Sequence, residues 1–271
     1  MPEGHTLHRL AHELTQHFGG HAITASSPQG RFVAGAARLD GHRFLHAEAW
    51  GKHLLLGFDG VEETLHIHLG LYGGLNLVEG SGLPVVGQVR LRIEDAAHTA
   101  DLRGPTSCAL FGPDEVDALL ARLGPDPLRG DADPSAAYAR IRSSRTAIAT
   151  LLLNQDVIAG VGNVYRAELL FRHGVDPFMP GSAVDEGLWD DVWKDIVGLM
   201  NEGVRLGRID TVRPEHEPEA MGRAPREDDH GGEVYVYRRA GQGCLVCDTP
   251  VEVQTLASRN LFWCPLCQQR R

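Results

Sequence analysis

The pattern of apolar and polar residues changes along the chain. Residues 3–18 place apolar side chains at helical spacing, which predicts an amphipathic N-terminal helix. From about residue 20 to residue 111 the pattern becomes short alternating or apolar runs separated by glycine-rich turns. Many short strands with such turns favour an antiparallel β-sandwich or barrel. The clearest runs are Arg43–Trp50, His53–Phe58, Thr64–Leu69, Leu75–Val78 and Val89–Glu94.

The second half of the chain has a helical pattern. It begins after residues 124–134, a stretch rich in proline and glycine that predicts a linker. The periodicity is lost at 210–232, where proline, glycine and acidic residues are frequent, and we expect a mobile loop there. The predicted helices are Ala136–Arg142, Thr146–Leu153, Val164–His173 and Gly187–Leu206.

These patterns predict an α+β multidomain fold. Residues 1–124 would form the N-terminal helix and an antiparallel β-sandwich. Residues 125–232 would form a helical domain that includes the mobile loop, and residues 233–271 a compact module that contains cysteines. A chain of 271 residues is long enough to give each of these parts a core.

Composition excludes several classes of protein. The hydrophobic fraction of 42% is too high for a disordered chain. No stretch approaches the roughly 18 uncharged apolar residues of a membrane span. The first residues lack a basic region followed by an apolar run, so we see no secretion signal. We therefore expect a soluble cytoplasmic protein that does not bind membranes.

The net charge of −10 at first argues against a nucleic-acid partner. The acidic residues, however, are concentrated in residues 112–135, 185–195 and 215–229, each of which is net −4. The rest of the chain holds 19 acids and 21 bases, so the total excludes little. Only Lys52 and Lys194 are lysines among the 26 basic residues, a bias typical of a GC-rich genome. A retained lysine therefore suggests a need for its compact ammonium group.

Four of the five cysteines have the spacing of a metal site. They are Cys244, Cys247, Cys264 and Cys267, two CxxC pairs separated by 16 residues. This is the spacing of a tetrahedral zinc site with four thiolates, and the residues between the pairs can form a β-hairpin. Two disulfides are the alternative, but a cytosol keeps thiols reduced. We predict one structural zinc ion, while Cys108 lies in an apolar run and is interpreted as a core thiol.

The segment 151–165 has the features of a helical turn that can bind phosphate. A helix ends there, Gly160 and Gly162 allow a tight turn, and Asn163 stands where the next helix would begin. The free N–H groups of a helix N-terminus suit a phosphate. An ordinary helical hairpin with an Asn cap would show the same pattern, so the residues alone leave both interpretations open.

Several motifs, in order along the whole chain, together resemble one known family. The family is that of the bifunctional DNA glycosylases, which includes formamidopyrimidine-DNA glycosylase and endonuclease VIII. The opening residues, with Gly4, look more like the endonuclease VIII branch. The matching segments are Met1–Gly4, Gly51–Leu56, His68–Gly73, Gly160–Phe171 as a helix–two-turn–helix, and Ser258–Gln268 as a zinc finger.

The resemblance implies a catalytic role for three residues. Removal of Met1 would expose the secondary amine of Pro2, which would attack C1′ of the damaged nucleotide and form an iminium ion. Glu3 would be the acid/base partner, and Lys52 would contribute positive charge beside a phosphate. Without the resemblance, Pro2 is simply a residue suited to starting a helix, and Glu3 an acid favoured by the helix dipole.

The resemblance also implies which residues contact double-stranded damaged DNA. Asn163 and Arg259 would bind phosphates on both sides of the lesion, and His68 would contact phosphate, although it may equally be an ordinary strand residue. Leu71 and Tyr72 would fill the gap left by the flipped base. Some endonuclease VIII proteins carry a larger polar residue where this chain has Gly70, so the composition of this wedge is open.

Taken together, we expect a monomeric base-excision-repair enzyme in a bacterial cytoplasm, associated with the nucleoid through DNA. It would remove oxidised pyrimidines and cleave by β,δ-elimination, with no nucleotide cofactor, because the sequence has no Walker lysine or dinucleotide fingerprint. Two alternatives remain. One is an enzyme of the same family that acts on 8-oxoguanine and formamidopyrimidines, and the other is a zinc-dependent DNA-binding protein without catalysis.

Overall fold

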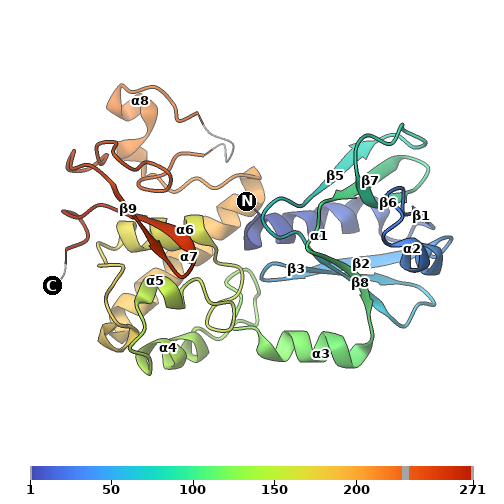
Figure 1. Cartoon of the computed structure of the whole chain (residues 1–271), viewed down its shortest axis with the longest axis horizontal. Helices are drawn as coiled ribbons and strands as arrows, with labels where there is room; N and C mark the ends of the chain where they lie inside the picture. Colours follow the sequence, from blue (N-terminus) through green and yellow to red (C-terminus); the bar gives the residue numbers. More distant parts are fainter. Residues whose placement is uncertain (1, 228–231, 270–271) are drawn as a thin grey trace. The chain divides into compact units, whose positions relative to one another are not determined.

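Buried apolar residues gather in two separate clusters, one in each half of the chain. The computed structural model describes residues 2–227 and 232–269. It divides into two compact units, Met1–Arg122 and Leu123–Arg271 (Figure 1). Within the described ranges, no helix has the length and apolar character needed to cross a membrane.

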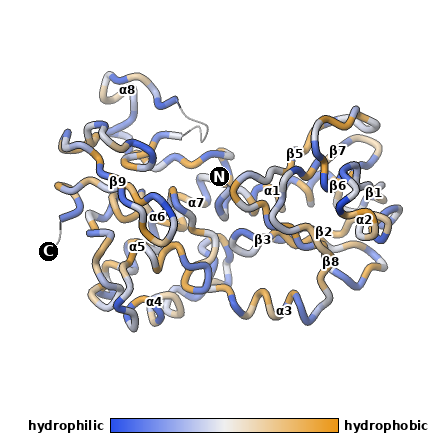
Figure 2. Tube along the Cα trace, in the orientation of Figure 1, coloured by the Kyte–Doolittle hydropathy of each residue, from blue (hydrophilic) through white to orange (hydrophobic). Residues whose placement is uncertain are grey.

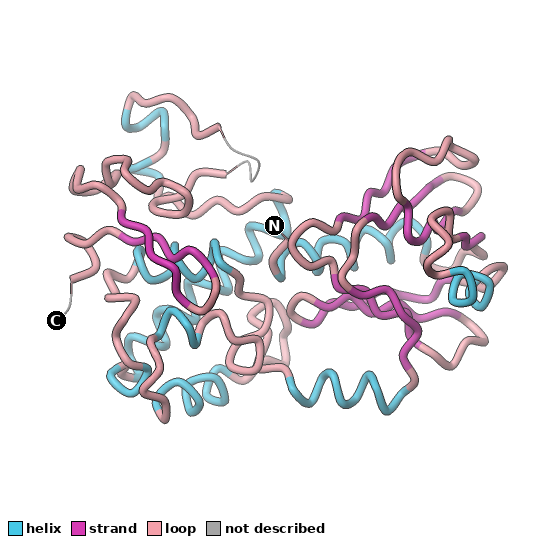
Figure 3. The backbone as a smooth tube through the Cα atoms, viewed as in Figure 1, coloured by secondary structure: helices cyan, strands magenta, loops and turns pink. Residues whose placement is uncertain are grey.

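The first unit combines a β-sandwich with helices. Its two four-stranded sheets are antiparallel, in the orders β1-β6-β7-β5 and β2-β3-β4-β8. Strands are drawn in magenta in Figure 3. The helices are α1 (Gly4–Phe18), α2 (Val33–Leu39) and α3 (Pro113–Arg122). The strands are β1 (Thr24–Ser26), β2 (Phe44–Trp50), β3 (His53–Phe58), β4 (Thr64–His68), β5 (Gly74–Glu79), β6 (Val89–Glu94), β7 (His98–Arg103) and β8 (Ser107–Phe111).

Helix α1 packs its apolar side on the sandwich and so belongs to the core of the first unit. Leu7, Leu14 and Phe18 are almost completely buried. They join a cluster that contains residues from both sheets, such as Leu54 of β3 and Leu91 of β6. The alternation of apolar and polar residues that predicted this helix can be followed along its trace in Figure 2. Because α1 is held by the core, the residues just before it have a fixed position.

The second unit is helical and ends in a β-hairpin. Its helices are α4 (Pro134–Arg142), α5 (Ile148–Leu151), α6 (Asn163–Arg172), η1 (Gly181–Ala183), α7 (Glu186–Leu206), η2 (Pro214–His216) and α8 (Pro218–Met221). The hairpin pairs β9 (Glu252–Leu256) with β10 (Arg259–Trp263). Leu261, Phe262 and Trp263 of β10 lie in the same buried cluster as Tyr165 of α6. The hairpin therefore shares its core with the helices.

The predicted fold class is confirmed: the chain has an N-terminal helix, antiparallel sheets, a helical region and a terminal hairpin with four cysteines. In the stretch where we expected a mobile loop, residues 210–227 contain the short helices η2 and α8. Residues 228–231 of that stretch lie outside the described residues, as do Met1, Arg270 and Arg271. The mobility of the stretch stays a prediction.

Candidate functional site

The N-terminal residues are held at the start of α1. Glu3 is the N-cap residue of this helix, and its backbone carbonyl accepts a hydrogen bond from the N–H of Thr6 at 2.9 Å. Its side chain makes no capping hydrogen bond and is fully buried. An acid that only stabilises a helix dipole sits well at the surface. The burial of the Glu3 carboxyl group beside half-buried Pro2 is instead suited to a role in chemistry.

Lys52 lies in a tight turn rather than in a strand. Trp50 of β2 pairs with His53 of β3, which leaves Gly51 and Lys52 as a two-residue hairpin turn. Gly51 has a φ of +57°, which the first position of such a turn requires and which glycine adopts without strain. The turn thus fixes the backbone of Lys52, and its side chain is half-buried.

Three histidines gather next to this lysine on one face of the sheet. His66 and His68 alternate along β4, and His53 of β3 pairs with His68. Nδ1 of His53 lies 2.9 Å from Nε2 of His66, and Oγ of Ser107 lies 3.2 Å from Nδ1 of His66. The rings of His53 and His68 have centroids 5.0 Å apart. A hydrogen-bonded chain therefore runs from β8 through β4 to β3.

The environment of these imidazoles keeps them uncharged. Burial lowers the pKa of His53 to about 3, with a further contribution from the neighbouring His68. Burial also lowers the pKa of His66 to about 4. The pKa of His68 is lowered by burial and then by the charge of Lys52. At neutral pH these rings can donate or accept hydrogen bonds but add no positive charge.

We expect acid to destabilise the first unit through these histidines. An unfolded histidine takes up a proton below pH 6.5, whereas folded His66 does so only near pH 4, so stability is lost as the pH falls through this window. Going from pH 7 to pH 5 should cost about 1–2 kcal/mol through His66 alone. Thermal unfolding at both pH values measures this loss. His66→Phe should reduce it, and His12→Gln at an exposed position should not.

The turn between β4 and β5 exposes two large apolar side chains. Leu71 is 38% exposed and Tyr72 is 94% exposed. Gly70 precedes them with a φ of +71°, and a Cβ at this position would lie 2.0 Å from Oγ1 of Thr106. A larger residue at position 70 would therefore have a strained backbone and would have to displace the Thr106 side chain. Leu71 and Tyr72 are the exposed side chains of this turn, and their role as a wedge stays a prediction.

In the second unit, α6 begins at Asn163 after a turn shaped by a glutamine. Gln155 donates from Nε2 to the carbonyl of Val161 at 2.9 Å, and its Oε1 accepts from the N–H of Gly160 at 3.0 Å. The Gly160 φ is +87°. Asn163 itself is nearly buried, and its Nδ2 donates to the carbonyl oxygen of Asn260 at 2.8 Å. This hydrogen bond joins the turn before α6 to the β9–β10 hairpin.

The hairpin tip carries Arg259 into solvent. Leu256 pairs with Arg259, and the two residues between them, Ala257 and Ser258, have φ values of 52° and 59°. Both are left-handed conformations that are strained for residues other than glycine. Arg259 is exposed, and the residue after it holds Asn163. One hydrogen bond therefore links Asn163, a predicted phosphate-binding residue, to the neighbour of Arg259, which is the other one.

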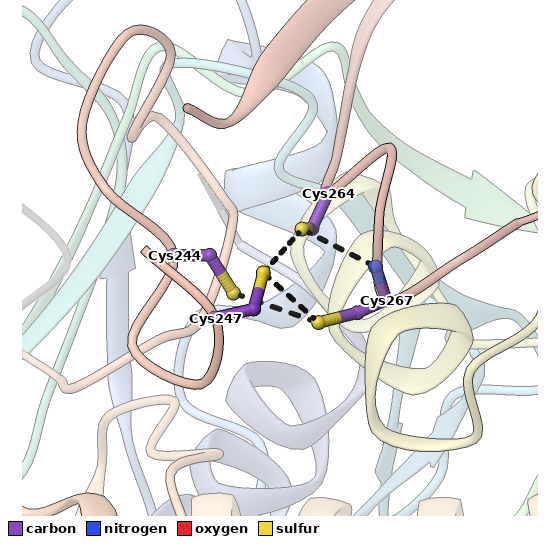
Figure 4. Close-up of side chains that lie close together, drawn as sticks. All are labelled: Cys244, Cys247, Cys264 and Cys267. Atoms are coloured by element: carbon purple, nitrogen blue, oxygen red, sulfur yellow. Dashed lines mark hydrogen bonds between the residues drawn. The ribbon is translucent and has the colours of Figure 1, made fainter. Parts of the chain in front are cut away.

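The four cysteines of the C-terminal module converge with their sulfur atoms toward one another (Figure 4). Their Sγ atoms all lie within 4.8 Å of each other, and neighbouring pairs are 3.4 to 3.9 Å apart. A metal with metal–sulfur bonds of about 2.3 Å in a tetrahedron needs sulfur atoms roughly 3.8 Å apart. The donor set therefore fits a metal ion.

The fifth cysteine, Cys108, belongs to the first unit. Burial raises the pKa of its thiol to about 12, so it is no nucleophile at neutral pH.

The carboxylate of Glu168 in α6 anchors the segment that leads to the cysteines. It accepts hydrogen bonds from three consecutive backbone N–H groups, those of Tyr235, Val236 and Tyr237, at 2.7 to 2.9 Å. The Thr211 hydroxyl is a fourth donor, at 2.7 Å. Because Glu168 is fully buried, its carboxylate depends on these hydrogen bonds to replace the water it has lost.

Replacement of Glu168 by Gln should destabilise the second unit by about 3–5 kcal/mol, because buried donors would then face an amide –NH₂ group. Urea unfolding of the two proteins measures this change. Glu202→Gln is the matched control, because the Glu202 side chain on α7 is 44% exposed and pairs with Arg205. A Glu168→Gln protein as stable as this control would contradict the anchoring role.

The structure thus assembles two groups of residues, one in each unit. Lys52 and His68 lie together with His53 and His66 in the first unit, and Asn163 is joined to the residue after Arg259 in the second. Sequence reasoning did not single out His53, Ser107, Gln155 or Glu168. The alternation of His66 and His68 was a signal for the histidine face, because period two places both on one side of a strand.

Comparisons with known proteins place the chain in a family. Residues 1–108 match the family described as formamidopyrimidine-DNA glycosylase N-terminal domain, and residues 123–214 match the formamidopyrimidine-DNA glycosylase H2TH domain. "Endonuclease 8 1" of Mycobacterium tuberculosis is 49% identical over 275 residues, which cover 99% of this chain and 100% of that protein. The chain belongs to this family of DNA-repair glycosylases. Its endonuclease 8 and formamidopyrimidine-DNA glycosylase members are DNA glycosylases with AP-lyase activity.

More distant relatives and solved structures agree with this membership. "Formamidopyrimidine-DNA glycosylase" of Methylococcus capsulatus is 30% identical over 242 residues, which cover 85% of this chain and 84% of that protein. The Lactococcus lactis Fpg in complex with DNA that contains an abasic site has a TM-score of 0.80 at 22% identity, with 99% and 100% of the two chains covered. The Thermus thermophilus MutM (Fpg) protein gives 0.75 at 26% identity, with 98% of both chains covered. The fold of the family therefore extends over the whole chain.

Proposed function

We propose that this glycosylase removes oxidised bases, preferably pyrimidines, from double-stranded DNA and then cleaves the strand. The observation that carries the proposal is the 49% identity, over practically the whole chain, with a protein named endonuclease 8. Buried Glu3 beside Pro2 supports it from the structure. The enzyme would act as a monomer in the cytoplasm, on the DNA of the nucleoid.

The reaction would begin at Pro2 once Met1 is removed. The free secondary amine attacks C1′ of the flipped nucleotide, and the base leaves with the electron pair of the glycosidic bond. Glu3 protonates the ring oxygen, so the sugar opens and the amine becomes an iminium ion. Loss of a proton from C2′ then expels the 3′ phosphate, and a second elimination expels the 5′ phosphate. Hydrolysis of the iminium releases the sugar fragment and leaves a one-nucleotide gap.

The remaining site residues would hold the DNA. Lys52 would supply positive charge beside a phosphate, and neutral His68 would donate a hydrogen bond to one. Leu71 and Tyr72 would enter the space vacated by the flipped base, where an apolar side chain and a ring can stack. In the second unit, Asn163 and Arg259 would bind backbone phosphates. The hydrogen bond from Asn163 to Asn260 supports their cooperation.

The metal held by the four cysteines would be zinc. Four thiolate donors at tetrahedral spacing are typical of a structural zinc ion and leave no position for substrate. We propose that it fixes the β9–β10 hairpin that carries Arg259. The functional division would then be a catalytic domain at 1–124, a helix–two-turn–helix domain at 125–232 and a zinc finger at 233–271.

Borohydride trapping on a duplex with one abasic site tests the chemistry. The wild-type protein should give a covalent adduct, and Pro2→Gly, with its primary amine, should give much less. An intact mass without Met1 should accompany the reaction. Absence of an adduct from wild-type protein that lacks Met1 would contradict the proposal and favour a DNA-binding protein without catalysis.

A panel of duplexes with single lesions tests the substrate class. Release of oxidised pyrimidines such as 5-hydroxyuracil should exceed release of 8-oxoguanine. The relative named formamidopyrimidine-DNA glycosylase, at 30% identity, makes the purine-type enzyme the second candidate. Strong excision of 8-oxoguanine with no pyrimidine activity would establish that candidate instead.

Arg259→Ala should weaken binding to abasic-site duplexes by roughly 10-fold, because one exposed phosphate contact is lost. The slope of the logarithm of affinity against the logarithm of salt concentration should become smaller by about one, because about one counterion fewer is released. Metal content should stay the same, because Arg259 lies at the exposed tip of the hairpin. Fluorescence anisotropy at several salt concentrations measures the affinity, and loss of metal in this variant would show a structural role instead.

A further inference from the structure

A chain of hydrogen bonds holds one edge of the His53 ring. Nδ1 of His53 lies 2.9 Å from Nε2 of His66, and Nδ1 of His66 lies 3.2 Å from Oγ of Ser107. His66 is buried, whereas His53 is half-buried. The two nitrogens of an imidazole lie on different edges of the ring. The edge of His53 that carries Nε2 is therefore the one not turned toward His66.

This chain permits two arrangements of its protons. Burial lowers the pKa of His53 to about 3 and that of His66 to about 4, so at neutral pH each ring carries a single N–H. If Ser107 donates to His66, then His66 donates to His53, and the N–H of His53 is on Nε2. In the reverse order, Nε2 of His53 carries a lone pair. A ligand that accepts a hydrogen bond from this nitrogen favours the first arrangement.

Two cationic side chains lie near the same ring. Lys52 precedes His53 in the turn between β2 and β3, and exposed Arg122 is the last residue of α3. After burial and the neighbouring histidines, the charges of Arg122 and Lys52 are the next causes that lower the pKa of His53. Because such effects fade over roughly 10 Å, both cations belong to the surroundings of His53. A neutral donor with two positive charges nearby suits an anion.

We propose that Lys52, His53 and Arg122 form one site for a phosphate of the DNA backbone, with Nε2 of His53 as a neutral hydrogen-bond donor. The inference rests on the proposed function, in which Lys52 lies beside such a phosphate. A phosphate oxygen accepts the hydrogen bond, and the two cations supply the attraction that a neutral ring lacks. Ser107 and His66 are positioning residues, because they act only through the proton of His53.

Affinity for a duplex with one tetrahydrofuran abasic analogue separates charge from hydrogen bonding. Arg122→Gln should weaken binding and lower the slope of the logarithm of affinity against the logarithm of salt concentration by about one. His53→Phe should weaken binding by about 10-fold with an unchanged slope, because it removes a hydrogen bond to a charged group but no charge. His53→Gln, whose amide can donate in place of Nε2, should bind nearly as tightly as the wild type.

Fluorescence anisotropy at several salt concentrations measures these affinities. Arg38→Gln is the matched control for the charge, because Arg38 on α2 is exposed and pairs with Glu63. Its salt slope should equal that of the wild type. A His53→Phe protein with wild-type affinity, or an unchanged slope in Arg122→Gln, would overturn the proposal.

A double-mutant cycle tests the positioning by Ser107. Ser107→Ala removes the donor to His66, so fewer molecules carry the His53 proton on Nε2, and binding should weaken by about 2- to 5-fold. In the His53→Phe background the same substitution should have no further effect. Ser107→Thr keeps the hydroxyl and should bind like the wild type. Equal losses in both backgrounds would contradict an action through His53.

Duplexes in which one phosphate at a time is replaced by a neutral methylphosphonate identify the ligand. One such position should weaken binding by the wild type, and there Arg122→Gln and His53→Phe should cause little further loss. If both variants lose the same factor on every duplex, they do not act through a backbone phosphate. These measurements require binding alone, so a wild type that binds but forms no trapped adduct would contradict the proposed function and leave this site intact.

Discussion

Replacing Glu3 by Gln is expected to slow the release of an oxidised base by about 10²- to 10⁴-fold, the range that a positioned general acid contributes. The amide keeps nearly the same shape as the carboxyl group but cannot give up a proton to the sugar ring oxygen. The Glu3 side chain makes no capping hydrogen bond to α1, so a substitution of the same shape should leave the helix and the fold intact. Single-turnover excision from a 5-hydroxyuracil duplex measures the rate.

The same variant should still react with an abasic site. An abasic sugar equilibrates with its open aldehyde form, so Pro2 can form the iminium ion without protonation of the ring oxygen. Borohydride trapping on an abasic duplex should therefore fall much less than base release. Glu13→Gln is the matched control, because Glu13 lies on the same helix and pairs with Arg9 at 2.8 Å on the surface. Equal excision rates for the two variants would show that Glu3 is not the acid.

Helical periodicity and short apolar runs in the sequence predicted several elements well. Helix α1 and strands β3 and β6 are of this kind, and their predicted ranges agree closely with the structure. Strand β7 is not among the clearest runs of the sequence, and its buried positions include Asp101, which reads as a polar residue of a loop. In the structure, Nε and Nη2 of Arg92 donate to this carboxylate at 2.7 and 2.9 Å. Asp101 is thus a buried position that a hydropathy pattern takes for an exposed one.

The candidate site shows the same division between local and long-range information. The four cysteines could be found because the spacing of two CxxC pairs is a local signal, typical of a metal site with four thiolates. Glu168 could not, because its partners at Tyr235–Tyr237 lie almost seventy residues away along the chain. The contact between Gly70 and Thr106 was equally hidden, since it depends on how two turns meet. The sequence showed that Gly70 was unusual, and only the fold shows which side chain replaces it.

Removal of the metal should have the largest effect on stability. Structural zinc sites contribute about 10–16 kcal/mol of apparent binding energy to the folded state. Cys264 is completely buried. The hairpin that leads to it has no core of its own, because Leu261, Phe262 and Trp263 pack with the helices. Loss of the metal should therefore free β9 and β10, expose part of the helical core and break the hydrogen bond between Asn163 and Asn260.

Cys264→Ala, or a chelator, should consequently give an early unfolding transition of the second unit and loss of DNA binding. The first unit has its own core and should unfold separately, at the temperature it shows in the wild type. Cys108→Ala is the matched control, because Cys108 lies in β8 of the first unit and should leave the metal content unchanged. Calorimetry with metal analysis checks both variants. A metal-free protein with unaltered unfolding and full affinity for abasic DNA would contradict the structural role, because the hairpin would then hold Arg259 in place without its metal.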